Sequence, residues 1–271
     1  MWPVAAVALL LVVAGISAAV GWHRATGTPG RVAATASDQV QRASSVLIVG
    51  DSFVGGTGDP SFPVYPELLG ELMGWNVRVD GVGGSGFMPQ LDAGGRRPPG
   101  GRRAPLIERL PADQRHYRPD VVLVDAGRND LGRVPSQVIP YIDDYFERLR
   151  AAFPQARIVA LIPTYATDRE ATNLPALRAA ITGAVRGYQG LVIDPAAQHW
   201  YDRADLRSLL GPDDVHFNGA GNRYYARRIA DALRSAGFGV GTQGGAAAHG
   251  GPITTGDGVG ASTAAGTGAG G

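Results

Sequence analysis

The chain of 271 residues contains no cysteine and no lysine. Without cysteine it forms no disulfide, offers no thiol nucleophile and has no thiolate to bind zinc. All 25 basic residues are arginine and 24 residues are acidic, which gives a formal net charge of +1. A charge so close to neutrality gives no reason to expect nucleic acid or an acidic partner. The five histidines are scattered without metal-binding spacing, so the sequence predicts no dedicated metal site.

The first 22 residues differ from the rest, because residues 2–22 carry no charge and are almost entirely small or aliphatic. About 20 such residues suffice to cross a bilayer, and the small residues at 17–19 would suit a signal peptidase. We therefore predict export, with residues 1–22 either a cleaved signal peptide or a transmembrane anchor. The protein would then be secreted, or membrane-anchored with its main domain outside the cytoplasm. A buried core helix is the alternative for this stretch.

Composition also sets the expected domain organisation. Residues 23–44 are polar and alanine-rich, which is typical of a stalk or linker. Residues 239–271 are mostly Gly, Ala, Thr and Ser without periodicity, so we expect a disordered tail there. The intervening residues, 45–238, have ordinary globular composition and are predicted to form one domain.

Within that domain, short apolar runs alternate with segments of helical periodicity. Such alternation predicts an α/β fold, with a five-stranded parallel sheet and helices on both faces. The expected strands are 45–50, 76–80, 120–125, 157–162 and 191–194. The expected helices are 63–74, 141–153, 175–188 and 219–236.

The first expected strand ends abruptly in Gly50, Asp51 and Ser52. Open parallel sheets place their chemistry at the carboxyl ends of strands, so Ser52 is a candidate nucleophile. Asp51 and Ser52 could equally make an ordinary turn or cap a helix, and Asp51 is expected to orient the turn. A nucleophilic serine would need a base, a group that orients the base, and donors for an oxyanion.

A base and its partner are available just before the last expected helix. Asp213 and His216 are three residues apart, so one turn can bring carboxylate and imidazole together. Asp214 is a competing acid, although the three-residue spacing favours Asp213. His216 could instead merely cap or pack against the helix. His199 is the other histidine considered, as a decoy base or a pocket wall.

Two further strand ends could supply oxyanion donors. Asn129 follows the third expected strand and can present a neutral amide, unless it is an ordinary turn residue. The glycine-rich stretch 81–86 lets a backbone N–H approach a substrate closely. That stretch also spells G-x-G-x-x-G, but it follows the second strand and opens no helix, which argues against a dinucleotide site. Asp130 is expected to pin the loop that carries Asn129.

These pieces stand in a recognisable order: G-D-S at 50–52, the glycine-rich turn at 81–86, G-R-N-D at 127–130 and D-D-V-H at 213–216. The chain thereby resembles the SGNH (GDSL-type) hydrolase family over most of residues 46–236. The resemblance implies a three-layer, flavodoxin-like α/β/α fold. It also implies Ser52 as nucleophile, His216 as base, Asp213 as its orienting acid, and oxyanion donors from the Ser52 N–H, the Gly84 N–H and the Asn129 side chain. Gly83 and Gly86 are close rivals to Gly84.

The activity implied by this resemblance is that of a serine esterase or lipase. It would hydrolyse acyl or acetyl esters of a small molecule, lipid or glycan through an acyl-enzyme, without a cofactor or metal. An acyltransferase acting on an envelope glycan or lipid and a non-catalytic envelope-binding module are the alternatives. The larger α/β-hydrolase family fits less well, because Val54 stands where its G-x-S-x-G motif requires glycine.

An arginine-rich stretch, residues 96–103, follows the second of these motifs. On a Pro/Gly-rich loop it could form a lid or a clamp for an anionic substrate. A solvated loop in an arginine-biased chain is the plainer interpretation. The loops 87–105 and 164–174 are expected to form walls of the pocket.

Overall fold

The computed structural model describes residues 43–56, 61–91, 95–96, 103–166, 171–202 and 204–239, all within one compact unit. The expected signal peptide or anchor (1–22), most of the expected stalk (23–44) and nearly all of the expected tail (239–271) lie outside these residues. No helix in the described part of the chain is long and apolar enough to cross a membrane.

Five parallel strands form one sheet in the order β2-β1-β3-β4-β5. Their bounds are β1 Ser45–Gly50, β2 Asn76–Gly81, β3 Val121–Asp125, β4 Arg157–Leu161 and β5 Leu191–Ile193. Each strand lies within two residues of its expected position. The predicted α/β class and parallel sheet are therefore confirmed.

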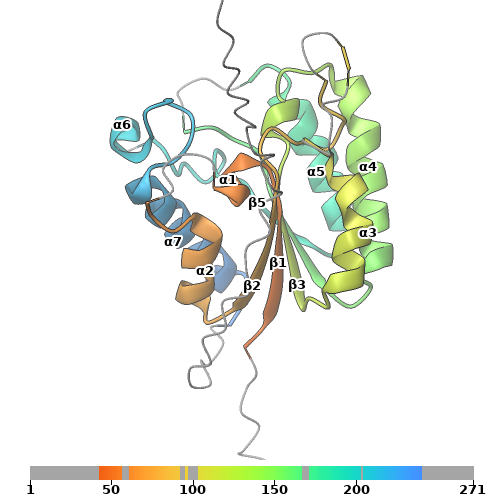
Figure 1. Cartoon of the computed structure of the whole chain (residues 1–271), viewed down its shortest axis with the longest axis horizontal. Helices are drawn as coiled ribbons and strands as arrows, with labels where there is room; N and C mark the ends of the chain where they lie inside the picture. The colour runs from red at the N-terminus through yellow and green to blue at the C-terminus, as the bar shows by residue number, and fades with distance from the viewer. Residues whose placement is uncertain are drawn as a thin grey trace, which may run out of the picture. The chain divides into compact units, whose positions relative to one another are not determined.

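Helices cover both faces of this sheet, as Figure 1 shows. Helices α2 (Tyr65–Met73) and α7 (Gly219–Ser235) pack together on one face. The other face carries α3 (Leu106–His116), α4 (Pro135–Ala152) and α5 (Leu174–Gly187). Strand β1 shows why the sheet needs a layer of helices on each face, because its alternating side chains enter two different cores. Leu47 and Val49 join the core under α3–α5, whereas Val46 and Ile48 join the core under α2 and α7.

Two helices differ from the expectation. Helix α4 begins at Pro135, six residues before the expected start, because Pro135 is well suited to the first turn. Pro140 lies inside α4 and removes only its own backbone donor. Helix α3 was not anticipated, because Pro111 interrupts it and only three of its eleven residues are buried. The remaining helical segments are single turns: α1 (Ser52–Gly55), η1 (Arg128–Asp130) and α6 (Leu206–Leu209).

The strand order determines where a site can form. The chain adds β2 on one side of β1 and then adds β3, β4 and β5 on the other side. The switch lies between β1 and β3, which are hydrogen-bonded parallel neighbours with Gly50 opposite Asp125. In open α/β sheets, ligands bind at such a switch point, beyond the carboxyl ends of the strands. Ser52 follows β1 and Asn129 follows β3, so both candidate residues leave the sheet at this point.

Candidate active site

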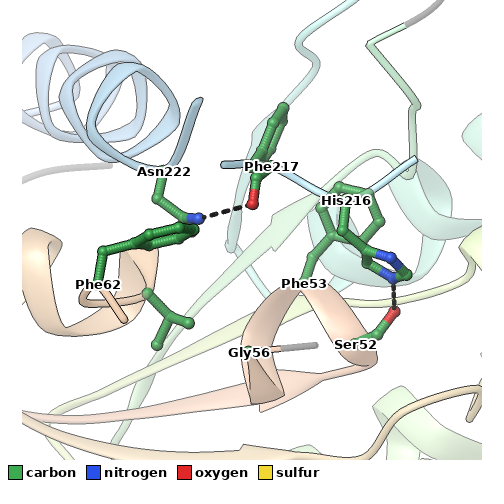
Figure 2. Close-up of a pocket in the computed structure, with 8 residues that line it drawn as sticks. Ser52, Phe53, Gly56, Phe62, His216, Phe217 and Asn222 are labelled. Carbon is green, nitrogen blue, oxygen red and sulfur yellow. Dashed lines mark hydrogen bonds between the residues drawn. The ribbon is translucent and has the colours of Figure 1, made fainter. Parts of the chain in front are cut away.

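Ser52 and His216 come together although 164 residues separate them. His216 Nε2 lies 2.8 Å from Ser52 Oγ, the contact drawn in Figure 2. His216 Nδ1 lies 2.5 Å from Asp213 Oδ2. The serine thus contacts the imidazole, and the imidazole contacts the carboxylate, which is the arrangement that a serine nucleophile requires.

The chain holds Ser52 by capping a single helical turn. The Asp51 carboxylate accepts a hydrogen bond of 3.0 Å from the Phe53 N–H, which makes Asp51 the N-cap of α1. The turn closes at Gly56 with φ of 78°. A side chain on Gly50 would collide with the Asp125 carbonyl oxygen, 2.2 Å from the position of its Cβ. Ser52 therefore starts its turn where β1 and β3 lie closest together, and Asp51 orients that turn as expected.

The loop before α7 holds Asp213 and His216 in register. The Asp213 carboxylate also accepts hydrogen bonds from the backbone N–H groups of Val215 and His216, at 3.1 and 2.9 Å. The Gly211 N–H in turn donates to the His216 carbonyl at 2.7 Å. Asp213 is half exposed, and burial acts to raise its pKa. The hydrogen bonds from the His216 side chain and backbone outweigh that effect and lower the pKa of Asp213 to about 2.

Asn218 fixes the same loop to the start of α7. Its carboxamide oxygen caps the helix by accepting from the Ala220 and Gly221 N–H groups, at 2.8 and 3.0 Å. Its Nδ2 donates to the carbonyls of Ser208 and Leu210, each at 2.9 Å. Asn218 therefore joins the start of α7 to the segment that precedes the histidine loop.

The competing candidates lie elsewhere. Asp214 makes no hydrogen bond to His216 among the described contacts and has a left-handed φ of 54°. His199 pairs with Asp202 at 2.8 Å on an exposed stretch, and neither lies among the residues around Ser52. Of the residues considered as base and acid, only His216 contacts Ser52 and only Asp213 pairs with His216.

Asn129 lies in the cleft beside Ser52, and its amide is already oriented. One Nδ2 hydrogen donates to the Ser85 carbonyl at 2.8 Å. A carboxamide nitrogen carries two hydrogens, so the second is available to a ligand. The neighbouring Asp130 accepts from the Phe87 N–H at 2.8 Å and from Gln90 Nε2 at 2.9 Å. Asp130 thus pins the glycine-rich segment against the Asn129 turn.

The structure separates the rival glycines. Gly83 and Gly84 line the cleft with Ser52 and Asn129. Gly86 is buried against Asp130, whose carboxylate lies 2.4 Å from where a Cβ would stand. Gly84 adopts a φ of 71°, and within the described residues its N–H makes no hydrogen bond. These features leave Gly84 with a backbone donor to offer, and its role as an oxyanion donor stays a prediction.

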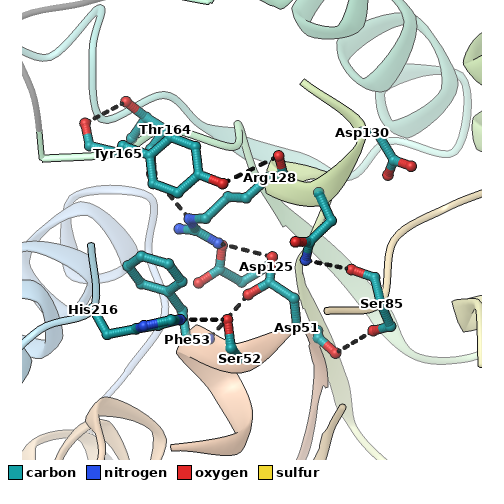
Figure 3. Close-up of polar contacts among 12 residues, drawn as sticks. Asp51, Ser52, Phe53, Ser85, Asp125, Arg128, Asp130, Thr164, Tyr165 and His216 are labelled. Carbon is teal, nitrogen blue, oxygen red and sulfur yellow. Dashed lines mark hydrogen bonds and ion pairs between the residues drawn. The ribbon is translucent and has the colours of Figure 1, made fainter. Parts of the chain in front are cut away.

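Beneath Ser52 lies a buried ionic cluster that the sequence analysis did not identify. Arg128 is 3% exposed, and its Nη1 lies 2.6 Å from Asp125 Oδ1 and 3.7 Å from Asp51 Oδ2. The guanidinium also stacks on Phe53, 4.1 Å from the ring centroid (Figure 3). It donates a hydrogen bond of 3.0 Å to the Tyr225 hydroxyl. Phe53 also contacts the His216 ring, and the two ring centroids are 5.2 Å apart. In the sequence, only the position of Arg128 between Gly127 and Asn129 could have indicated that it lies at the site.

Two carboxylates share this single cation, and their hydrogen bonding is unequal. Asp125 is satisfied by Arg128 and by the Tyr65 hydroxyl, which donates to it at 2.9 Å. Asp51 is completely buried, and its Oδ2 has no hydrogen-bond partner among the described residues. Burial raises the pKa of Asp51 to about 6, against the opposing effect of Arg128. Burial would lower the pKa of Arg128, but Asp125 raises it, so Arg128 remains charged.

Two hollows open beside the serine and histidine. A narrow one of about 10 Å³ lies between the apolar side chains of Phe62, Val64 and Phe217, and Asn222 also lines it. Figure 2 shows Phe62, Phe217 and Asn222 around it. A wider cleft of about 370 Å³ lies on the Asn129 side, with Arg103, Tyr165 and Val215 in its wall. Arg103 and Tyr165 belong to the two loops expected to form pocket walls, whereas Phe62 and Val215 were not anticipated. No group of three or more potential metal ligands occurs in the described part of the chain.

Comparison with known proteins agrees with this geometry. Residues 48–224 match the GDSL-like Lipase/Acylhydrolase family. A GDSL lipase of Mycobacterium tuberculosis is 29% identical over 204 residues, which cover 71% of this chain and 82% of that protein. Fold and sequence together define an α/β acyl hydrolase. The chain belongs to the GDSL-like lipase/acylhydrolase family, as its four motifs predicted.

Solved structures share the fold at lower identity. Est24, a carbohydrate acetylesterase from Sinorhizobium meliloti, has a TM-score of 0.53 at 16% identity, covering 71% of this chain and 99% of its own. The aryl esterase of M. smegmatis has a TM-score of 0.51 at 17% identity, with 71% and 99% coverage. A family two carbohydrate esterase from Clostridium thermocellum has a TM-score of 0.56 at 16% identity, covering 73% of this chain and 66% of its own.

Proposed function

We propose that this protein is a serine esterase that hydrolyses short acyl esters through an acyl-enzyme on Ser52. The observation that carries the proposal is the chain of contacts from Ser52 Oγ to His216 Nε2 at 2.8 Å and from His216 Nδ1 to Asp213 at 2.5 Å. Membership of the GDSL-like family supports the reaction class.

In the proposed reaction, His216 Nδ1–H donates to Asp213, which leaves Nε2 to accept the Ser52 proton. Ser52 Oγ attacks the ester carbonyl and a tetrahedral oxyanion forms. The Ser52 N–H, the Gly84 N–H and the second amide hydrogen of Asn129 stabilise its charge. The C–O bond then breaks as His216 protonates the leaving alcohol. Water repeats the sequence, releasing the acid and restoring Ser52.

The size of the narrow hollow supports a short acyl group. A space of about 10 Å³ between Phe62, Val64 and Phe217 corresponds to roughly one water-sized group. An acetyl methyl suits such a space, whereas a long acyl chain would have to lie in the wider cleft. Acetylated carbohydrates and aryl acetates are the first substrates to test, because related folds carry those activities.

We also propose that the enzyme acts outside the cytoplasm, on the strength of the uncharged residues 2–22. A fusion of residues 1–44 to alkaline phosphatase, which is active only after export, tests this directly. An inactive fusion would contradict it.

The experiment for the activity compares aryl esters from acetate to palmitate, using the wild type, Ser52→Ala and His216→Ala. We expect acetate to be preferred, and both variants to lose at least about 10³-fold in kcat, since one lacks the nucleophile and the other lacks the base that activates it. His199→Ala is the matched control, because His199 is an exposed histidine paired with an aspartate away from the serine. Undiminished turnover by Ser52→Ala would refute the proposal. Transfer of the acyl group to an added alcohol instead of water would indicate the acyltransferase alternative.

A further inference from the structure

Arg103 is the feature of the site that ester hydrolysis alone does not explain. It lines the wider cleft together with Ser52, Asn129 and His216. Within the described residues, Arg103 takes part in no hydrogen bond and no ion pair. The other arginine in the cleft wall, Arg128, is buried and neutralised by Asp125. Arg103 is thus the one uncompensated cation among the described residues of the wall.

The Arg103 side chain is also held in place over the expected oxyanion site. Its Cγ, Cδ and Nε atoms run past Gly84, at 3.3, 3.2 and 3.0 Å from where a Cβ would stand. Glycine at position 84 therefore makes room for this stem as well as adopting its φ of 71°. A stem packed in this way has lost part of its rotational freedom before any ligand arrives, which reduces the entropic cost of binding.

The backbone of Arg103 also has an unusual conformation. Its φ of 57° lies in the left-handed region, which is unfavourable for a residue with a side chain. Strain of this kind persists where surrounding structure enforces it, and it concentrates at ligand-binding sites. Arg103 combines this backbone conformation with a place in the cleft wall.

The charge around Arg103 defines what it could bind. No aspartate or glutamate lies among the described residues of the cleft wall. The remaining wall offers neutral donors and the hydrophobic groups Tyr165 and Val215. A guanidinium with its donors unused is suited to a planar carboxylate or a phosphate, which it can bind through two hydrogen bonds.

We infer that Arg103 is a specificity residue that selects esters carrying an anionic group, a carboxylate or phosphate, close to the scissile bond. This inference rests on the proposed esterase function and names the substrate class for it. The anionic group binds the Arg103 guanidinium while the ester carbonyl lies between Ser52 and Asn129. It can belong to the acyl part or to the alcohol part.

Two matched substrate pairs show whether the anionic group belongs to the acyl part or to the alcohol part of the ester. The alcohol pair is 3-carboxyphenyl acetate against its neutral isostere 3-carbamoylphenyl acetate. The acyl pair is mono-4-nitrophenyl succinate against its neutral terminal amide. For the wild type we expect the anionic member of at least one pair to have a kcat/KM at least tenfold higher, mainly through KM. Added salt should reduce that preference, because it screens an exposed charge.

The decisive variant is Arg103→Gln, read through the anionic-to-neutral ratio and not through absolute rate. We expect the ratio to fall to near one, Arg103→Lys to restore part of it, and Arg103→Glu to reverse it. Arg227→Gln is the matched control, since Arg227 is an exposed arginine on α7. A ratio unchanged by Arg103→Gln, or a wild type without any preference, would overturn the inference.

Binding separates this inference from the proposed function. In Ser52→Ala, 3-carboxyphenyl acetate and mono-4-nitrophenyl succinate can be titrated calorimetrically with and without Arg103→Gln. At least fivefold weaker binding of either ester in the double variant supports Arg103 as the anion site, even if the wild type hydrolyses no ester. Equal binding refutes it, even if the wild type is an active esterase.

Discussion

Asn129 shows how a single side chain is prepared for its proposed role. Its amide nitrogen has two hydrogens, and one is committed to the Ser85 carbonyl at 2.8 Å. That bond fixes the plane of the amide, so the second hydrogen needs no reorientation when an oxyanion forms. Preorganised donors of this kind contribute most of their stabilisation in the transition state.

We predict that Asn129→Ala lowers kcat by about 10²–10³-fold, equivalent to roughly 3–4 kcal/mol, with little change in KM. Steady-state kinetics on an aryl acetate provides the test, with thermal unfolding to verify that the variant is folded. Asn222→Ala is a poor control because Asn222 anchors Tyr65, so Asn76→Ala, on an exposed sheet edge, is preferable. A variant with raised KM and unchanged kcat would show that Asn129 only helps to bind substrate.

The site residues themselves could be predicted from the sequence to a considerable extent. Ser52, Asn129 and the Asp213–His216 pair each stand at a strand end or just before a helix, where parallel sheets gather their loops. The buried Arg128 could not be predicted, because its partners come from the cap of α1, from β3 and from α7, and burial of a charge leaves no periodic signal. Phe62 and Val215 were missed because single apolar loop residues carry no pattern.

At the scale of elements, helix α7 and the loop before it act as one unit. Gly221, in the first turn of α7, allows the helix to approach this loop. A Cβ on Gly221 would stand 2.1 Å from the Leu209 carbonyl oxygen and 2.7 Å from the Phe217 ring. Any side chain at this position must displace the segment that carries Asp213 and His216.

A pair of glycine substitutions tests that coupling. Gly183 is exposed within α5, and a Cβ there meets nothing within 4 Å. Gly183→Ala should therefore stabilise the protein by about 0.5–1 kcal/mol through helix propensity and leave turnover unchanged. Gly221→Ala should destabilise it by at least about 1–3 kcal/mol and reduce kcat about tenfold or more by moving the histidine. Chemical denaturation and aryl acetate kinetics measure both effects. Full activity in Gly221→Ala would show that the loop position is independent of α7.

The elements were predicted with unequal success, for physical reasons. Strands β1, β3 and β4 are buried and read as continuous apolar runs, so they could be located. The edge strands β2 and β5 were also placed, although β2 has no buried residue. Helix α3 escaped because its exposed face is polar and Pro111 lies within it. The start of α4 was placed late, because the apolar face that predicted the helix was traced only from residue 141, whereas α4 begins at Pro135.

For the molecule as a whole, buried carboxyl groups set the dependence of stability on pH. Burial raises the pKa of Asp51 and of Asp130 to about 6. Burial, followed by the nearby Asp80, raises the pKa of Asp113 to about 8. An unfolded aspartate titrates near 3.9. Above that pH, the folded protein holds protons that the unfolded chain has lost.

We therefore predict that the free energy of unfolding is larger at pH 5 than at pH 8. The stabilising protons are fully effective below about pH 4, and their contribution is lost as pH rises through about 6 and then 8. Each such group contributes a slope of about 1.4 kcal/mol per pH unit while only the folded state binds its proton. Denaturant unfolding at fixed pH values measures this trend.

Asp113→Asn should flatten the pH dependence between about 6 and 8, whereas Asp144→Asn, on an exposed pair with Arg148, should not. Stability that rises from pH 5 to pH 8 in the wild type would contradict the assignment of these buried groups.

The most direct test of the central claim is covalent labelling of the full chain by diethyl 4-nitrophenyl phosphate, followed by peptide mass spectrometry. The Ser52 oxygen should displace 4-nitrophenolate from phosphorus, because His216 removes its proton. We predict one diethylphosphoryl group per chain, on Ser52, and a labelling rate at least about 10²-fold slower in His216→Ala. Labelling at another residue, or an unchanged rate in His216→Ala, would show that Ser52 and His216 do not form an activated nucleophile.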